Sequence, residues 1–257
     1  YQGQTVKFRA YENMVYTAHP ADVSSESMSI YIPEAYFTKG GTVNGYTAKT
    51  APIFMPNGVG GYMPGTICAP SENDKMSGGA NASLGALAHG YVVAAPAIRG
   101  RTTKNSDGVY VGKAPALIVD YKAAVRYLRH NRNKLPAGDT EKIISNGTSA
   151  GGALSALLGA TGNAAEYEPY LRAIGAAEER DDIFASMDYC PITNLDHADM
   201  AYEWVFNGQN DYHQSRMMMP PAGMKPGALP TGAPAGGAKT DRPANAPTDT
   251  VEATPMT

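Results

Sequence analysis

The sequence has few cysteines, no marked excess of charge of either sign and no long apolar run, and each shortage excludes a class of protein. Two cysteines in 257 residues, Cys68 and Cys190, do not make a disulfide framework, and the sequence leaves open whether they are bonded to each other. A formal net charge of −3, with both signs mixed, offers no basic stripe to nucleic acid. No apolar run is long enough to span a membrane. These shortages favour a protein that acts on a small neutral or aromatic molecule, with neither nucleic acid nor a membrane as its partner.

Large apolar side chains are almost absent from the end of the chain. From Met217 onward the sequence consists mainly of Pro, Gly, Ala and Thr. Such a composition cannot bury enough surface to offset the entropy lost on ordering. We therefore expect a folded core over residues 1–216 and a disordered low-complexity segment over residues 217–257.

Strand and helix signals alternate along the folded part. Strands are expected at residues 5–9, 28–33, 53–55, 91–95 and 183–189, the first two as an antiparallel lead-in. The apolar spacing over residues 117–128 predicts a helix, and another helix is expected to start within residues 196–204. The expected fold class is α/β, with a mostly parallel sheet flanked by helices.

The most informative motif is a G-x-S-x-G pattern made by Gly147, Ser149 and Gly151. A β-prone apolar run precedes it and a helix-forming Ala/Leu run follows it. In a strand, tight turn and helix of this kind, the serine hydroxyl projects from the edge of the sheet as a nucleophile. The N–H of Ala150 would then point at the developing oxyanion. Ser149 is the candidate nucleophile, and the alternative is a serine that only caps a helix in a Gly-rich turn.

A second Gly-rich segment, residues 55–62, follows the strand expected at residues 53–55. A loop at this place in an esterase supplies the second oxyanion donor. Gly60 and Gly61 suit that role because a residue without a side chain lets its N–H approach the substrate oxygen closely. The alternative is a plain turn.

Several blocks of the sequence resemble one known family. They are residues 51–57, 59–65, 99–103, 112–116, 146–152, 189–192 and 197–204. Together, in unbroken order from about Gln4 to His213, they resemble the bacterial tannase (tannin acyl hydrolase) family. The resemblance implies an α/β-hydrolase fold and a serine esterase that cleaves galloyl esters and depsides of plant polyphenols through an acyl-serine intermediate.

The resemblance also implies roles for individual residues. Carried over to the matching positions, Ser149 is the nucleophile, Ala150 and Gly61 or Gly60 bind the oxyanion, and Ile192 lies against the aromatic acyl ring. No metal or other cofactor is implied. Feruloyl or other phenolic-acid esters are the alternative substrates, and a hydrolase-like chain without catalytic activity is the alternative function.

The acid and the histidine of the catalytic triad come late in the chain in this architecture. Downstream of Ser149 the only histidines are His197 and His213. Both lie where the sequence resembles the entry into the family's lid domain, so neither is expected to be the base. We expect the sequence, which begins at Tyr1, to be one part of a longer polypeptide. A missing C-terminal portion would then supply the lid, the last strands, the acid and the base.

We accordingly expect the chain as given to be an incomplete enzyme. A secreted or cell-surface location in a bacterium is favoured, because polymeric tannins are met outside the cell.

Two further groups of polar residues look like sites. The acidic residues around His197 resemble a metal cluster, but helical spacing turns His197 away from them, so a solvated polar face is the preferred interpretation. Arg99 and Arg101 follow an apolar strand and are expected to pair with buried carboxylates rather than to bind an anion.

Overall fold

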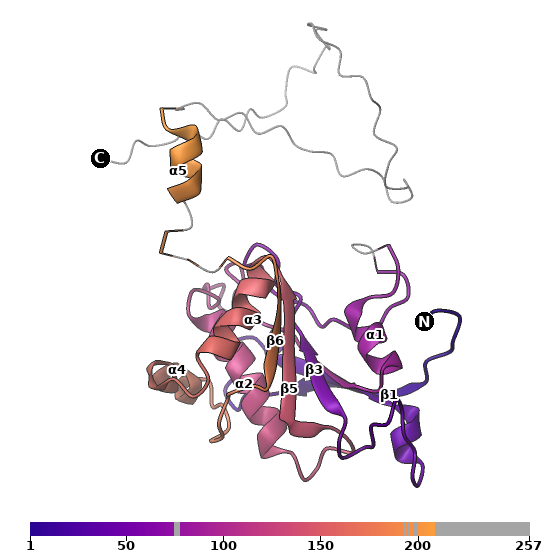
Figure 1. The fold of residues 1–257 in the computed structure, drawn as a ribbon. Coiled ribbons are helices and arrows are strands. Elements are labelled where there is room, and N and C mark those ends of the chain that lie inside the picture. Colours follow the sequence, from indigo (N-terminus) through magenta and orange to yellow (C-terminus); the bar gives the residue numbers. More distant parts are fainter. Residues whose placement is uncertain (75–77, 193, 195, 198–199, 209–257) are drawn as a thin grey trace, which may run out of the picture. The chain divides into compact units, whose positions relative to one another are not determined.

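The computed structural model describes residues 1–74, 78–192, 194, 196–197 and 200–208 (Figure 1). Tyr1–Asp196 forms one compact unit, and a second unit starts at His197 and is described as far as its helix α5, Met200–Phe206. The predicted boundary at residue 216 and the segment 217–257 lie outside the described residues and stay predictions.

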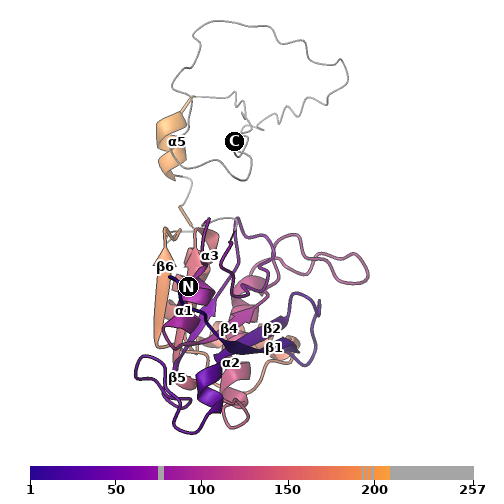
Figure 2. The same cartoon turned by 90° about the vertical axis from the view of Figure 1, so that its right-hand side faces the viewer.

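Six strands of the described residues form one sheet, in the order β1-β2-β4-β3-β5-β6. They are β1 Phe8–Val15, β2 Ser27–Pro33, β3 Pro52–Pro56, β4 Val92–Pro96, β5 Asp139–Thr148 and β6 Ala185–Tyr189. The pairs β1–β2 and β2–β4 are antiparallel, whereas β4–β3, β3–β5 and β5–β6 are parallel. Figure 2 shows β6 at one edge of the sheet and β1 and β2 on the other side. The predicted antiparallel lead-in and parallel continuation are confirmed.

Helices cover both faces of this sheet (Figure 1). Helix α1, Ala82–Ala88, packs on one face, while α2, Ala116–His130, and α3, Ala150–Ala160, pack on the other. A short helix α4, Glu168–Ala173, contacts α2. Short 3₁₀ helices occupy Glu34–Phe37 and Ala165–Tyr167. None of the helices in the described residues has the length and apolar character needed to cross a membrane.

The central strands β2, β3 and β4 are buried, whereas the edge strands β1 and β6 are largely exposed. Successive side chains of a strand point to opposite faces, so a strand covered on both faces contributes to two clusters. Ile53 and Met55 of β3 belong to the larger core, which also contains residues of α2 and α3. Phe54, between them, belongs to a smaller cluster with Leu87 of α1. The five residues of β3 are all buried. This double coverage explains why the central strands have continuous apolar sequences.

Most predicted elements are present with shifted ends. The predicted helix over residues 117–128 is α2, and the strand predicted at 28–33 is β2. The first strand, predicted at residues 5–9, runs instead from Phe8 to Val15. A bulge near Asn13, whose φ is 57°, lets it continue pairing with β2 after the alternation of polar and apolar residues has ended.

Two helices of the compact unit, α1 and α4, were not predicted, and α5 begins only at Met200. Both missed helices are short, with seven and six residues, so neither shows an apolar period that can be recognised. A local signal existed for α1, because the Asn81 side chain accepts a hydrogen bond from Leu84 N at 3.0 Å and caps the helix.

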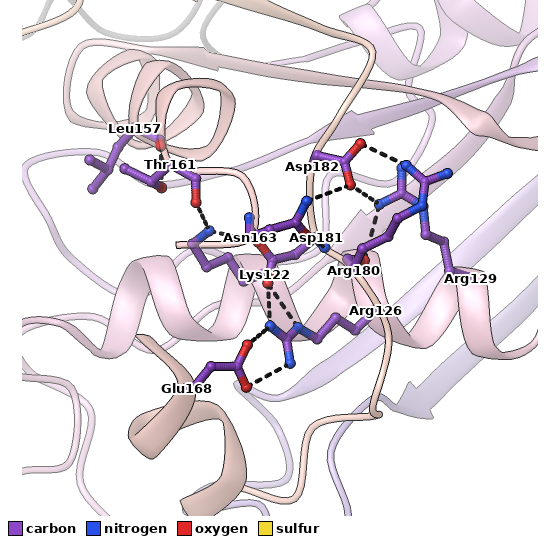
Figure 3. A network of polar contacts seen from close by, with 10 residues as sticks. All are labelled: Lys122, Arg126, Arg129, Leu157, Thr161, Asn163, Glu168, Arg180, Asp181 and Asp182. Atoms are coloured by element: carbon purple, nitrogen blue, oxygen red, sulfur yellow. Dashed lines mark hydrogen bonds and ion pairs between the residues drawn. The ribbon is translucent and has the colours of Figure 1, made fainter. Parts of the chain in front are cut away.

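A buried network of charges joins α2 to the segment that follows α3 (Figure 3). Asp181 accepts hydrogen bonds from Lys122 Nζ and Arg126 Nε, both at 2.8 Å. All three side chains are almost completely buried, and Arg126 also pairs with Glu168 of α4. The backbone N–H of Asn163 donates to Asp181 at 2.8 Å. The network therefore holds the segment between α3 and β6 against α2.

Arg99 forms a second buried ion cluster, as its sequence context predicts. Its guanidinium makes several hydrogen bonds to the Asp120 carboxylate, and its backbone N–H donates to the same carboxylate at 2.9 Å. Glu26, which is completely buried, lies 3.7 Å from Arg99 Nε. The same expectation is wrong for Arg101, which is exposed and forms no ion pair within the described part of the chain.

Candidate active site

Ser149 occupies the turn between β5 and α3, at the carboxyl end of a parallel strand. Its backbone has φ 58° and ψ −120°, a conformation that a residue with a side chain rarely adopts and that costs about 1–3 kcal/mol. The turn is held from two sides. Ser149 N donates to Tyr189 O of β6, and Ser149 O accepts from Ala153 N, both at 2.9 Å. Hydrogen bonds to the neighbouring strand and to the first turn of the helix thus hold Ser149 in its strained conformation.

The flanking glycines are required by close backbone packing. A Cβ on Gly147 would lie 2.1 Å from Gly151 O, and a Cβ on Gly151 would lie 2.7 Å from Val59 O. A Cβ on Gly152 would lie 2.5 Å from Tyr189 O. Since real Cβ atoms do not approach backbone so closely, the turn can close only with glycine at these positions.

The Ser149 side chain is exposed and makes no capping hydrogen bond to α3, although it occupies the N-cap position. The alternative of a serine that merely caps the helix is therefore wrong. Ala150, the first residue of α3, is buried. N–H groups in the first turn of a helix lack partners within the helix and lie at the positive end of its dipole. The turn therefore combines an exposed serine with a helix N-terminus, where backbone N–H groups are available as donors.

The loop after β3 contains the two glycines that the sequence suggested as the second oxyanion donor. Gly61 has φ 55°, and the next residue, Tyr62, has φ 57°. A Cβ on Gly60 or on Gly61 would meet no atom of the described residues within 4 Å. Gly61 is therefore needed for its backbone conformation rather than for space. At Gly60, neither the backbone conformation nor the available space requires a glycine.

This loop is anchored by the segment that follows β4. Arg101 N donates to Tyr62 O at 2.8 Å, while Gly65 and Ile98 exchange two backbone hydrogen bonds of 2.9 Å. At the base of the loop the buried hydroxyl of Tyr121 donates to Met55 O. Burial raises the pKa of Tyr121 well above its ordinary value, so this hydroxyl stays protonated and remains a donor.

Asn57 links the loop to the Ser149 turn, and no sequence pattern indicated this link. It is buried, and its Nδ2 lies 3.0 Å from each of Asn146 O, Gly151 O and Ser155 Oγ. An asparagine after a strand resembles an ordinary turn residue. Only the pairing of β3 with β5 brings it to the turn.

Ile192 is also brought to this edge of the sheet. It follows β6 by three residues, and the last residue of β6, Tyr189, accepts the hydrogen bond from Ser149 N. The Ile192 side chain is 39% exposed, so it is available to contact another molecule. Cys190, which directly follows Tyr189, has a φ of 40°. Both Cys68 and Cys190 are free thiols, which answers the question that the sequence left open.

The two downstream histidines are not brought to Ser149 by the described compact unit. His197 is the first residue of the second unit, and His213 lies outside the described residues. In the part of the chain that the structure describes, no three His, Cys, Asp or Glu side chains are grouped so that they could hold a metal ion. Asp199 of the acidic group around His197 lies outside the described residues.

An exposed serine in a strained turn between a parallel strand and a helix is the arrangement of an α/β-hydrolase. The comparisons with known proteins agree with this class. The chain belongs to the BD-FAE family of α/β-hydrolases, whose profile matches residues 65–234. No curated protein matches the chain.

Solved structures of bacterial tannases are similar to the chain. A tannase from Fusobacterium nucleatum is 58% identical, with a TM-score of 0.76 over 82% of this chain and 43% of its own. A tannase from Lactobacillus plantarum is 53% identical, with a TM-score of 0.75 over 82% of this chain and 45% of its own. A tannin acyl hydrolase in complex with ethyl gallate is 50% identical, with a TM-score of 0.71 over 82% of this chain and 46% of its own. The chain thus spans less than half the length of each of these tannases.

Proposed function

We propose that this chain carries the nucleophile and the oxyanion donors of a serine esterase that cleaves galloyl esters and depsides of plant polyphenols. The observation that carries the proposal is the backbone of Ser149. A serine with this strained backbone, whose side chain is exposed and does not cap its helix, supports a functional role. Such strain accumulates where a nucleophile must be presented to substrate.

In the proposed reaction, Ser149 Oγ attacks the ester carbonyl while a base takes its proton. The carbonyl oxygen becomes an oxyanion, which accepts hydrogen bonds from the N–H groups of Ala150 and of Gly61 or Gly60. Collapse of this intermediate expels the alcohol, protonated by the same base, and leaves the acyl group on Ser149. Water then attacks the acyl-serine by the same route and releases the acid.

The aromatic acyl ring is proposed to lie against Ile192, beyond the end of β6. The half-exposed side chain of Ile192 and its position three residues after Tyr189 support this placement. One of the similar tannases was solved with ethyl gallate, which supports a galloyl ester as the substrate. The triad acid and histidine are proposed to come from residues outside the described compact unit.

The test is hydrolysis of methyl gallate by the product of the complete reading frame that encodes this chain. Ser149→Ala is expected to lower kcat by roughly 10⁴ to 10⁶-fold, as nucleophile deletions do in serine hydrolases. Ser145→Ala on β5, the strand that precedes Ser149, is the matched control, because its buried hydroxyl has no hydrogen-bond partner within the described residues. Rapid quenching followed by mass spectrometry should detect a galloyl group on Ser149.

Retention of more than about a tenth of the activity in Ser149→Ala would exclude Ser149 as the nucleophile, since deletion of a nucleophile costs far more than this. A parallel assay with methyl ferulate decides which acyl group the enzyme prefers. Faster turnover of ferulate than of gallate would replace the galloyl substrate by another phenolic-acid ester.

A further inference from the structure

Asn57 is the first residue after β3, and its backbone continues the pairing of β3 with β5. Its N–H donates to Asn146 O at 2.9 Å. The side chain is buried, with 7% of the residue exposed. A buried carboxamide has to satisfy both its oxygen and its two N–H groups inside the protein. The contacts that it makes therefore define what it holds together.

The Nδ2 of Asn57 faces the Ser149 turn and the oxygen faces the glycine loop. Nδ2 lies 3.0 Å from Asn146 O on β5 and 3.0 Å from Gly151 O in the first turn of α3. Oδ1 accepts a hydrogen bond from Val59 N at 3.3 Å. A single side chain thus bonds the end of the strand, the start of the helix and the first residues of the loop.

The space around this carboxamide exists because two residues of the motif are glycines. A Cβ on Gly147 would lie 2.6 Å from Asn57 Nδ2, and a Cβ on Gly151 would lie 2.5 Å from Asn57 Oδ1. The two glycines of the G-x-S-x-G motif therefore admit Asn57 as well as allow the turn to close.

The bonded segments carry the two proposed oxyanion donors. Ala150 directly precedes Gly151, whose carbonyl accepts a hydrogen bond from Asn57 Nδ2. Gly61 lies two residues after Val59, whose N–H donates to Asn57 Oδ1. An oxyanion hole acts only when both donors lie about 2.7–3.1 Å from one point. The separation of Ala150 N and Gly61 N thus depends on a link between the helix and the loop, and Asn57 provides a direct one.

We propose that Asn57 is a positioning residue, whose carboxamide sets the separation of the two oxyanion donors by tying the glycine loop to the start of α3. This inference rests on the proposed esterase function. Asn57 does not touch the reacting atoms in this role. Its effect is exerted through the backbone of Ala150 and Gly61.

The decisive variant is Asn57→Asp in the product of the complete reading frame. The carboxylate has nearly the same shape and retains an acceptor for Val59 N, but it opposes the carbonyl oxygens of Asn146 and Gly151. We expect kcat for methyl gallate to fall about 10²-fold while KM changes little, because an oxyanion donor acts mainly in the transition state. Asn57→Ala, which buries no new charge, is the second variant and should show the same division between kcat and KM.

Asn131→Asp is the matched control. Asn131 is the C-cap residue of α2, and its side chain also donates to a backbone carbonyl, Tyr127 O, at 2.9 Å. This variant tests for a general loss of stability and should leave kcat unchanged. Amide hydrogen exchange should accelerate at residues 59–61 in both Asn57 variants and not in Asn131→Asp.

An unchanged kcat in folded Asn57→Asp or Asn57→Ala would overturn the proposal. So would a rise in KM with kcat preserved. Exchange at residues 59–61 does not depend on catalysis, so it separates this inference from the proposed function. If Ser149→Ala kept its activity, the proposed esterase role would fail. If amide exchange at residues 59–61 were unchanged in the Asn57 variants, Asn57 would not hold the loop, whatever the outcome for Ser149.

Discussion

Removal of the Asp181 carboxylate is expected to destabilise the compact unit strongly. Asp181 lies in the buried network of Figure 3, with Lys122 Nζ at 2.8 Å and Arg126 Nη2 at 2.6 Å. The exposed fractions of the three side chains are 1%, 0% and 6%. In Asp181→Ala, Arg126 still has Glu168 as a counter-ion, but Lys122 keeps only the carbonyl of Thr161 among its hydrogen-bond partners within the described residues. A buried ammonium group is left without a carboxylate.

The size of the effect follows from the burial. Removing one partner of a buried ion pair costs about 3–5 kcal/mol, because the remaining charge is desolvated without compensation. For a domain of this size, each kcal/mol lowers the melting temperature by about 2–4 °C, so a fall of about 6–20 °C is expected. By contrast, Glu141 pairs with Arg180 at the surface, where the exposed fractions are 62% and 43%. Glu141→Ala should cost less than about 1 kcal/mol.

The assay is thermal and urea-induced unfolding of the 257-residue chain, followed by far-UV circular dichroism. Asp181→Ala and Glu141→Ala are compared with the parent at low salt and at about 0.5 M salt, where exposed pairs are screened and buried pairs much less so. Equal shifts in the two variants would show that the Asp181 network does not contribute as a buried network should. If the fall in melting temperature of Asp181→Ala disappeared at high salt, the ion pairs of Asp181 would likewise not act as buried pairs.

Two other predictions concern the glycine loop and the cysteines. Gly61→Val should lower kcat for methyl gallate about 10²-fold, because its φ of 55° does not suit valine. Gly60→Val should lower kcat much less, and equal effects would exclude a special role for Gly61. Burial raises the pKa of Cys68 to about 11, whereas Cys190 is exposed. Iodoacetamide at about pH 8 should therefore modify Cys190 alone in the native chain, since the thiolate is the reactive form, and prompt labelling of Cys68 would contradict this.

The local pattern of the sequence determined the parts of the site that are close together along the chain. Gly147, Ser149 and Gly151 lie within five residues, between a β-prone run and a helix-forming run, so the strand, turn and helix could be predicted without knowledge of the rest. The same holds for α2, whose apolar period over residues 117–128 covers about three turns. The pairing of Arg99 was predictable because a charge that follows a buried strand needs a buried partner.

Contacts between distant segments were decided by the tertiary structure alone. Asn57 and Gly151 are 94 residues apart, and they meet because β3 pairs with β5. Tyr189 O reaches Ser149 N because β6 pairs with β5 on the other side. Neither contact has a local signal, since a backbone carbonyl or an asparagine after a strand has the same sequence whatever its partner is. The positive φ of Gly61 was equally invisible, because the folded loop imposes this backbone angle.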